Sequence, residues 1–307
     1  MKKILAIGLL TIVVGACNKA DDYYHLGIDA FNAKNYEKAI VYFDSTLMLD
    51  QNNASAFINR ANAKYELNDF ENSLTDFAKG IEMWPKDESN RKELAMIYSE
   101  RADAYYELKK YDQAIEDYSE AITKDATLIS AYIGRGDAYI KKQIPDLAKA
   151  DYEKVISLDN KIANAHYGLG NFYYDSKDYE SAIVHYNLAI EIDNTIYAYY
   201  MDRGDSYYMI EKYNQAIEDF TKAIELKPDD AKAYIFRGDA KDNVDLGQDA
   251  LADYDKAIEI DPANSSAYYN RGITKRKLGD KKGACLDFNK AIELGRDDAK
   301  SYADECK

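Results

Sequence analysis

Arg-Gly-Asp occurs three times in this sequence, at residues 135–137, 203–205 and 237–239. On an exposed turn the triplet is the ligand of cell-adhesion receptors, whereas on a rigid helix its charged residues can form ion pairs with neighbouring side chains. The second copy begins 68 residues after the first, and the third begins 34 residues after the second. Such regular spacing indicates a requirement of the fold, so the chemistry of the triplet depends on the elements that hold it.

Residues that could carry catalysis or hold a metal ion do not stand in suitable patterns. The histidines, His25, His166 and His185, fall in three separate segments without metal-ligand spacing, and no nucleophile motif or phosphate-binding loop is present. The aspartates that recur with the period lie one repeat apart, too far to share an ion that needs oxygen ligands at about 2.4 Å. We therefore expect no enzyme activity, no metal site and no cofactor.

The N-terminus has the layout of a secretory signal peptide. Two lysines, an apolar run from Ile4 to Val14 and two small residues succeed one another over residues 1–16. The apolar run is too short to persist as a transmembrane helix. We therefore expect residues 1–16 to be removed after export.

A cysteine follows this segment directly. Val14-Gly15-Ala16-Cys17 resembles the lipobox of bacterial lipoproteins, and the resemblance implies acyl chains such as palmitate on Cys17 and a short tether over residues 17–22. The protein would then be lipid-anchored in the cell envelope. Asn18 is not the Asp that favours inner-membrane retention in enteric bacteria, so we expect the outer membrane. The alternative is an ordinary signal peptide with an incidental cysteine.

The formal net charge is −15, and loss of the two lysines of the signal peptide would make it −17. A surface this acidic repels nucleic acid and anionic lipid headgroups, and no Lys/Arg stripe with interleaved aromatic residues is present. We expect no nucleic-acid binding, and membrane contact through the lipid anchor only. For Cys285 and Cys306, a disulfide and two buried free thiols fit the sequence equally well.

From Ala20 to Asp298 the sequence repeats with a period of 34 residues. Each unit carries a small residue, an aromatic residue four positions later and an aliphatic residue four positions after that, which is the spacing of one apolar helix face. The small residues are Ala39, Ser73, Ala114, Ala148, Ala182, Ala216, Ala250 and Ala284. The aromatic residues are Phe43, Phe77, Tyr118, Tyr152, Tyr186, Phe220, Tyr254 and Phe288.

This pattern resembles the tetratricopeptide repeat (TPR), a 34-residue unit of two antiparallel helices. The resemblance implies an all-α fold, a right-handed superhelical solenoid of eight helix-turn-helix units over residues 20–298, with a short C-terminal capping helix in residues 299–307. Seven extra residues near 88–94 interrupt the period. Because seven residues are close to two helical turns, we expect one long helix from Ser89 to Lys109.

The arginine of each triplet is the seventh residue of its unit, counted from unit starts at residues 20, 54, 95, 129, 163, 197, 231 and 265. Six units have Arg at position 7 and Asp at position 23; the other two combine Leu26 with Tyr42 and Leu169 with His185. Only pairing within a unit fits all eight copies. We expect six partly buried ion pairs, Arg60–Asp76, Arg101–Asp117, Arg135–Asp151, Arg203–Asp219, Arg237–Asp253 and Arg271–Asp287.

The residue after each of these arginines is Gly or Ala. A glycine inside a helix costs about 0.5–1 kcal/mol relative to alanine, so it is retained where a Cβ atom would hold two helices apart. We expect Gly204 to lie against Ala216 for this reason.

By resemblance to the family, positions 2, 5, 9 and 12 of the first helices line a concave groove. Position 9 gives a polar, mostly acidic series, Asn62, Asp103, Asp137, Asn171, Asp205 and Asp239. Position 5 gives apolar surface, including Tyr24, Ile133, Tyr167, Met201, Ile235 and Tyr269. Such a groove suits an extended or helical segment of a partner protein, neutral or basic, with apolar anchors. The alternative is a solvated helix face without a fixed ligand.

These features favour a lipid-anchored scaffold of the cell envelope that binds partner proteins through its groove. A second possibility is a surface lipoprotein that captures glycans or other nutrients, but relatives of that kind carry large insertions, and this chain has only seven extra residues. A third is an Arg-Gly-Asp-dependent adhesin, which would need the triplet exposed on a turn.

Overall fold

The computed structural model describes residues 19–304, and every regular element among them is a helix. The predicted signal peptide, Cys17 and Cys306 lie outside the described residues, so lipidation of Cys17 stays a prediction. The chain divides at Asn160 into two compact parts, and each is described by itself.

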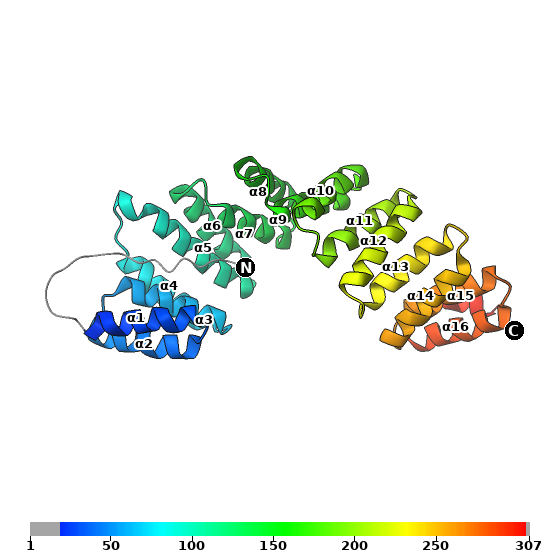
Figure 1. Ribbon diagram of the computed structural model, residues 1–307, viewed down its shortest axis with the longest axis horizontal. Helices are drawn as coiled ribbons and strands as arrows, with labels where there is room; N and C mark the ends of the chain where they lie inside the picture. Colours follow the sequence, from blue (N-terminus) through cyan, green and yellow to red (C-terminus); the bar gives the residue numbers. More distant parts are fainter. Residues whose placement is uncertain (1–18, 305–307) are drawn as a thin grey trace. The chain divides into compact units, whose positions relative to one another are not determined.

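The first part holds four consecutive helix pairs, coloured blue to green in Figure 1. The helices are α1 (Lys19–Asn32), α2 (Tyr36–Leu49), α3 (Ala54–Glu66), α4 (Phe70–Met83), α5 (Arg91–Glu107), α6 (Tyr111–Lys124), α7 (Ile129–Lys141) and α8 (Pro145–Leu158). Each odd-numbered helix packs against the even-numbered helix that follows it, and each pair packs onto the next.

The second part repeats this arrangement. Its helices are α9 (Ala163–Asp175), α10 (Tyr179–Ile192), α11 (Tyr197–Met209), α12 (Tyr213–Leu226), α13 (Ala231–Asp242), α14 (Gly247–Ile260), α15 (Ser265–Lys277), α16 (Lys281–Glu293) and α17 (Lys300–Asp304). Eight paired units and an all-α fold are therefore confirmed.

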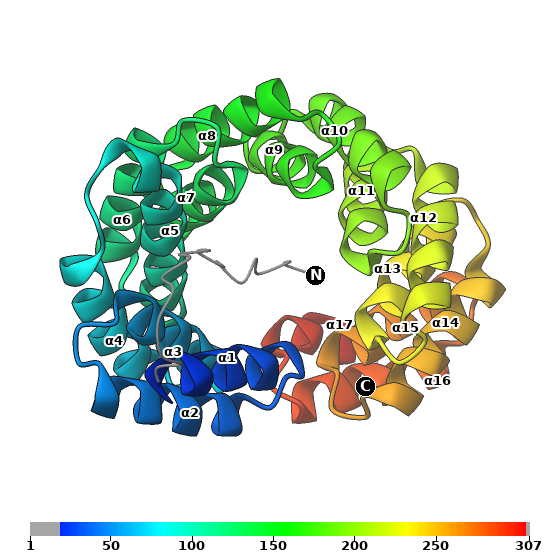
Figure 2. The same ribbon diagram turned by 60° about the vertical axis from the view of Figure 1, so that its left-hand side comes forward.

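Within each part the first helices of successive units contact one another. Figure 2 shows the result for the first part, where α5 and α7 lie in one layer and α6 and α8 in a second layer, drawn to the left of α5 and above α7. This arrangement brings residues that are one period apart onto a common surface.

Every unit turns from its first to its second helix in the same way. The fifteenth residue of each unit has a left-handed backbone, with φ between 58° and 63° at seven non-glycine residues and 89° at Gly279. In unit one, for example, the amide of Lys34 donates to Phe31 and that of Asn35 donates to Ala30, which caps the last carbonyls of α1. A constant turn of this kind keeps the two helices of every unit in the same register.

The core of each unit forms where the aromatic residue of the second helix meets the first helix. Phe43, Phe77, Tyr118, Tyr186, Phe220, Tyr254 and Phe288 are all buried. A Cβ atom on Gly204 would lie 2.8 Å from Phe220 and 3.1 Å from the Cβ atom of Asp219. Gly204 therefore lies against the Phe220 ring at position 24, and the expectation that it lies against Ala216 is wrong.

The seven-residue insertion gives unit three one long first helix as predicted, but α5 begins two residues later and ends two residues earlier than Ser89 to Lys109. A short 3₁₀ helix, Glu88–Asn90, precedes α5, which begins at Arg91 and has 17 residues, against 13 in α7, α9 or α11. Asp87 accepts hydrogen bonds from the backbone and side chain of Asn90 and caps the 3₁₀ turn. Only about one turn of the insertion therefore extends the helix.

The C-terminal end of the repeats is covered by a short cap. A 3₁₀ helix, Asp297–Ala299, leads into α17, and Ala299 is fully buried. The Tyr302 ring stacks on Phe288 with centroids 5.1 Å apart. The cap thus covers apolar surface of the eighth unit that a further unit would otherwise cover.

Candidate functional site

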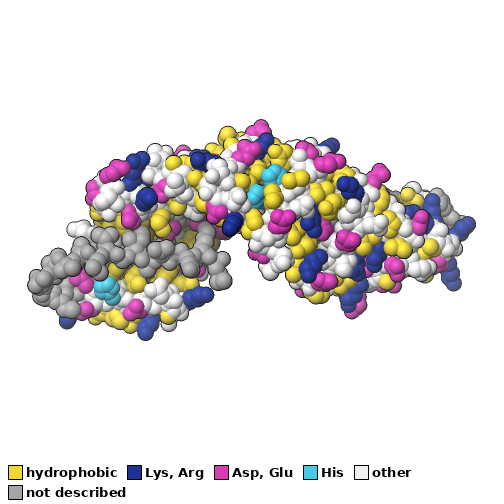
Figure 3. Space-filling model, turned by 45° about the horizontal axis from the view of Figure 1, so that its top comes forward, with side chains coloured by type: hydrophobic (Ala, Val, Ile, Leu, Met, Phe, Trp, Pro, Cys, Tyr) yellow, Lys and Arg dark blue, Asp and Glu magenta, His cyan; other side chains and the backbone are white. Residues whose placement is uncertain are grey.

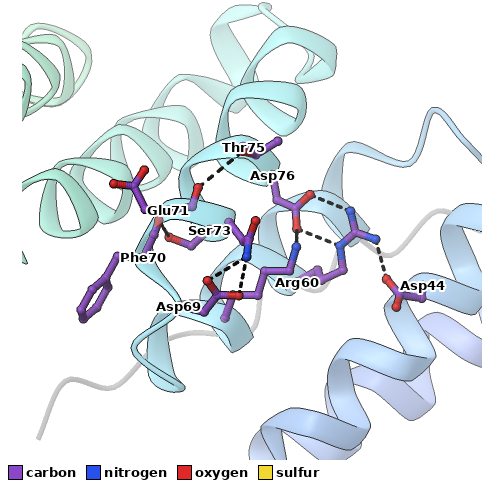
Figure 4. A network of polar contacts seen from close by, with 10 residues as sticks. Asp44, Arg60, Asp69, Phe70, Glu71, Ser73, Thr75 and Asp76 are labelled. Atoms are coloured by element: carbon purple, nitrogen blue, oxygen red, sulfur yellow. Dashed lines mark hydrogen bonds and ion pairs between the residues drawn. The ribbon is translucent and has the colours of Figure 1, made fainter. Parts of the chain in front are cut away.

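Arg60 and Asp76 exemplify the ion pair inside a unit (Figure 4). Arg60 on α3 donates from Nε and Nη2 to the two carboxylate oxygens of Asp76 on α4, at 2.8 and 2.6 Å. Lys64, one turn further along α3, donates to the same carboxylate at 2.6 Å. The pair therefore bonds the two helices of one unit in a planar, two-point geometry.

All six predicted pairs have this geometry, with Nε to Oδ2 distances of 2.6–3.0 Å. Their Nη2 to Oδ1 distances are 2.5–2.7 Å. The aspartate side chains are 3–8% exposed and the arginine side chains 16–19%. The carboxylates are thus buried, whereas one edge of each guanidinium reaches solvent.

Aromatic rings support each arginine. In all six units the guanidinium lies over the aromatic residue at position 4, with 5.3–5.7 Å to the ring centroid. Burial raises the pKa of Asp219, and the hydrogen bonds from Arg203 act in the opposite direction. The desolvation cost and the attraction therefore partly cancel, which is usual for buried pairs.

The third nitrogen of most arginines reaches the preceding unit, which the sequence reading missed. Nη1 donates to position 25 of that unit in five cases, Arg60 to Asp44, Arg135 to Ser119, Arg203 to Asn187, Arg237 to Thr221 and Arg271 to Asp255. The exception is Arg101, whose preceding unit has Ala78 at this position. The sequence carried a signal for this bond, because each of the five arginines follows a unit that has a polar residue at position 25.

The Arg-Gly-Asp triplets lie inside helices α7, α11 and α13. In α11, Arg203 is bound by Asp219 and Gly204 is buried against Phe220. Asp205 accepts a hydrogen bond from the hydroxyl of Tyr174 at 2.6 Å. The triplet is therefore distributed around a helix and not displayed on a turn.

Unit five replaces the ion pair with a histidine pair. His166 on α9 and His185 on α10 place their Nδ1 atoms 3.4 Å apart. The Tyr173 ring stacks on His185 at 5.4 Å with an interplanar angle of 10°, and Leu169 is buried in place of the arginine. In units one and five, which lack the arginine, the rings at positions 4 and 23 stack on each other. Histidines nineteen residues apart therefore meet, which their spacing in the sequence did not suggest.

The predicted groove carboxylates have a structural partner. The packing tyrosines at position 24 donate from their hydroxyls to position 9 of the same unit, each at 2.7 Å, in the pairs Tyr118–Asp103, Tyr152–Asp137, Tyr186–Asn171 and Tyr254–Asp239. Burial raises the pKa of Tyr118 and Tyr254, so these hydroxyls stay protonated as donors. Where position 24 is Phe, the polar residue bonds elsewhere, as Asn62 does to Glu100.

Successive first helices are also joined in the second part. Tyr167 donates to Asp202 at 2.5 Å and Tyr174 donates to Asp205, both from α9 to α11. Asn270 on α15 donates to Asp239 on α13 at 2.7 Å. We call these bonded side chains the inner seam. They fix partly exposed carboxylates and tyrosine rings on neighbouring helices.

The apolar groove residues divide into two groups. Met201 and Ile235 are 5% and 6% exposed and belong to the cores around Phe220 and Tyr254, so they cannot anchor a partner as predicted. Tyr24, Ile133, Tyr167 and Tyr269 are half-buried and keep part of their surface. Met201 and Ile235 are covered from both sides, because their clusters include Ala233 and Ala267 of the following units.

Asp239 is the most perturbed carboxylate of the inner seam. Burial raises its pKa to about 6, although hydrogen bonds from Tyr254 and Asn270 lower it. The nearby Asp242 raises it further, and Arg296 acts in the opposite direction. This group therefore titrates near neutral pH, where a basic partner would favour its ionised form.

In the eighth unit, Lys275 pairs with Asp287 and Lys277 with Asp242, at 2.8 and 2.5 Å. Both lysines thus form ion pairs within the protein. Cys285 is disulfide-bonded, so of the two alternatives for this cysteine the disulfide is confirmed and the free thiol is wrong. The partner sulfur lies outside the described residues.

Charges are mixed over the surface. Figure 3 shows acidic and basic side chains interspersed on the face drawn, without a broad area of one sign. Among residues 19–304, no group of three or more His, Cys, Asp or Glu side chains could hold a metal ion. No helix in that range is long and apolar enough to cross a membrane.

Family models match the chain repeatedly. Models described as TPR repeat or tetratricopeptide repeat match residues 102–143, 129–162, 163–195, 197–230, 248–279 and 265–298. These segments together cover more than half of the chain. The segments 129–162, 163–195, 197–230 and 265–298 coincide with units four, five, six and eight, whereas 102–143 and 248–279 each join parts of two consecutive units.

Solved structures and one curated protein are similar as well. The C-terminal part of a TPR protein from Cytophaga hutchinsonii has a TM-score of 0.64 at 23% identity, over 80% of this chain and 98% of that one. A tetratricopeptide repeat protein from Parabacteroides merdae gives 0.60 at 19%, over 84% and 99%. YrrB, a TPR protein with an unusual peptide-binding site, gives 0.57 at 24%, over 62% and 99%. At these identities the likeness shows the fold alone.

The curated relative is the STIP1 homolog of Dictyostelium discoideum, 36% identical over 67 residues. The match spans 22% of this chain and only 12% of that protein's length.

Proposed function

Since the chain belongs to the tetratricopeptide repeat family, we propose that it is a protein-binding scaffold that holds an extended or helical segment of a partner across its first helices. The partner segment is neutral or basic and carries aromatic or aliphatic anchors. The inner seam of the second part carries this proposal, because it presents carboxylates and tyrosine rings on three neighbouring helices.

Two physical properties support this role for the inner seam. Each of its carboxylates is held by a tyrosine hydroxyl or an amide, so the side chain loses little freedom when a ligand binds. A carboxylate accepts several hydrogen bonds. Tyrosine and amide donors bond Oδ2 of Asp205 and Oδ1 of Asp239, so the other oxygen of each carboxylate can accept from a ligand. Peptide binding in YrrB offers a precedent for this kind of ligand on the same fold.

We place the scaffold in the cell envelope, lipid-anchored through Cys17, with the outer membrane as the expected location. Lys19 begins α1 two residues after Cys17. A fully extended residue spans at most about 3.6 Å, so the anchor would hold unit one within roughly 10 Å of the membrane surface. The first helices would then present the partner segment at a set height above the lipid.

The test is a crosslinking pull-down of the full-length protein from its native envelope. In the test variant, Asp103, Asp137, Asp205 and Asp239 are changed to Asn, which removes charge while keeping an oxygen for the tyrosine hydroxyls. The matched control changes Glu116, Glu180, Glu218 and Glu259, exposed on second helices, to Gln. We expect the test variant alone to lose its specific protein partners.

An unchanged partner list for the test variant would contradict groove binding. A preparation that enriches a defined glycan and no protein would instead support nutrient capture. Release of the native protein from membranes by high salt, with Cys17 unmodified in mass spectrometry, would contradict the lipid anchor and leave the groove untouched.

A further inference from the structure

The two ends of the described repeats differ in how their apolar surface is covered. At the C-terminal end, the buried Ala299 and the ring of Tyr302 cover unit eight. At the N-terminal end, six apolar side chains of unit one form a surface that we call the end patch: Tyr23, Leu26, Val41, Tyr42, Met48 and Leu49. Leu26 is 42% exposed where Leu169, at the same position of unit five, is 3% exposed, so this part of the patch lacks the cover that a neighbouring unit gives. Val41 resembles Val184 of unit five, 56% exposed, and adds an outward-facing apolar side chain next to it.

Contacts and spacing make the end patch continuous. Val41, Met48 and Leu49 are 60%, 81% and 55% exposed, and they lie at i, i+7 and i+8 on α2, which places them on one side of that helix. The Tyr42 ring stacks on Tyr23 of α1 at 6.4 Å. Leu26, 42% exposed, lies one turn beyond Tyr23 on the same helix. Leu26 and Tyr42 occupy the positions that hold an Arg–Asp pair in six other units.

The composition of the end patch matches a lipid interface. Tyrosines favour the headgroup region, and aliphatic side chains favour the upper acyl region. Lys38, whose ammonium lies 5.6 Å from the centroid of Tyr42, can extend its charge towards headgroups. Asp21, Asp22 and Glu37 lie close by in sequence, so attraction to anionic lipids cannot account for binding.

Chain length argues against cover by the protein itself. If cleavage leaves Cys17 as the first residue, only Cys17 and Asn18 precede α1, and two residues span at most about 7 Å. An acylated Cys17 would instead bring bilayer lipid next to α1. We propose that the end patch rests on the membrane, as a second contact besides the acyl chains. This inference rests on the proposed anchoring at Cys17 and extends the expectation that the anchor is the only contact.

Anchoring by acyl chains alone leaves a protein free to tilt, whereas a second contact fixes its orientation. Burial of the apolar side chains of the end patch adds to the binding of the acyl chains, because each buried CH₂ contributes. Unit one would thus lie flat against the lipid, which orients the first helices of the units that follow it in the first part.

The experiment places a tryptophan at one position of two different units. Val41 and Leu286 both occupy position 22 of their units and are 60% and 66% exposed. The mature lipidated variants Val41→Trp and Leu286→Trp are reconstituted in phosphatidylcholine vesicles with brominated acyl chains, which quench indole emission at short range. The native Trp84 is buried, and wild-type protein supplies its baseline.

We expect Val41→Trp to shift to the blue and lose most of its added emission, and Leu286→Trp to match its emission in unbrominated vesicles. Equal quenching at both positions, or none at either in protein that floats with the vesicles, overturns the end-patch contact and leaves the anchor intact. Failure of the wild-type protein to float overturns both. If Val41→Trp with Cys17→Ser is already blue-shifted without lipid and sediments as a dimer, a second copy covers the patch and the inference is wrong.

Discussion

Units five and six have the same backbone but different contacts between their helices. Both pair a 13-residue first helix with a 14-residue second helix. Unit six joins them through Arg203 and Asp219, whereas unit five uses His166 and His185 beside a buried Leu169. The repeat therefore does not require an ion pair. It requires that neither the arginine at position 7 nor the aspartate at position 23 be buried without the other, so both positions change together.

The largest expected effect comes from removing one partner in unit six. Arg203→Leu leaves Asp219 buried without its cation, and we expect a loss of about 3 kcal/mol in the free energy of unfolding. The value lies at the lower end for buried pairs because the Arg203 side chain is 18% exposed. Urea unfolding followed by circular dichroism measures it. A loss no greater than that of Lys222→Leu, which removes an exposed pair on α12, would contradict a buried role.

Position 9 offers a comparison with a pH dependence. Unit five has Asn171 where unit seven has Asp239, whose pKa is raised by burial to about 6. The folded state then binds the proton more tightly than the unfolded state, so stability falls as pH rises from about 4 to about 6. Asp239→Asn copies unit five and should remove this dependence.

At pH 7.5 we expect Asp239→Asn to be more stable than the wild type by about 3 kcal/mol, and at pH 4 the two should be nearly equal. Thermal melts across this range measure the difference. Asn171→Asp is the reciprocal variant, and it should introduce a dependence of the same sign. Parallel pH curves for the wild type and Asp239→Asn would contradict the assignment.

The glycine at position 8 is packed more tightly in unit five than in unit six. A Cβ atom on Gly170 of unit five would lie 2.4 Å from the Tyr186 ring, whereas on Gly204 of unit six the closest ring atom is at 2.8 Å. We therefore expect Gly170→Ala to cost more than Gly204→Ala, about 2 against about 1 kcal/mol. Melting temperatures of the two variants test this order, and the reverse order would show that the rings at position 24 move aside more easily in unit five.

The smallest effect concerns the bond between units. Asn187→Ala removes the acceptor of Arg203 Nη1, and we expect a loss of about 1 kcal/mol. Asn289 occupies the same position in unit eight, where no arginine among residues 19–304 bonds it. Asn289→Ala should therefore leave stability nearly unchanged. Equal losses from the two variants would contradict a stabilising bond between Asn187 and Arg203.

Much of this architecture could be predicted because the period repeats it eight times. The joint presence of Arg at position 7 and Asp at position 23 indicated a contact, and both groups lie where that pattern required. The position-9 series was harder to interpret. The sequence does not distinguish an aspartate that accepts a hydrogen bond from a buried tyrosine from one that is available to bind a ligand. Only the packing of the helices brings Asp103 to Tyr118.

The start of the long helix α5 and the contact of the histidines could not be predicted for another reason. Where a lengthened helix begins depends on local caps, and Asp87 stabilises a 3₁₀ turn before Arg91. His166 and His185 occur together in one unit only, so no second copy of the pattern existed to reveal their contact. Repetition therefore made contacts predictable, and features present once had to be seen in three dimensions.

A double-mutant cycle on Arg203 and Asp219 tests the central claim most directly. Arg203→Leu, Asp219→His and the combined variant, which copies two residues of unit five, are compared by the free energy of unfolding. If the two groups form one buried unit, the double variant recovers part of the loss and is more stable than the sum of the single losses implies. A double variant that melts below both single variants would contradict the pairing.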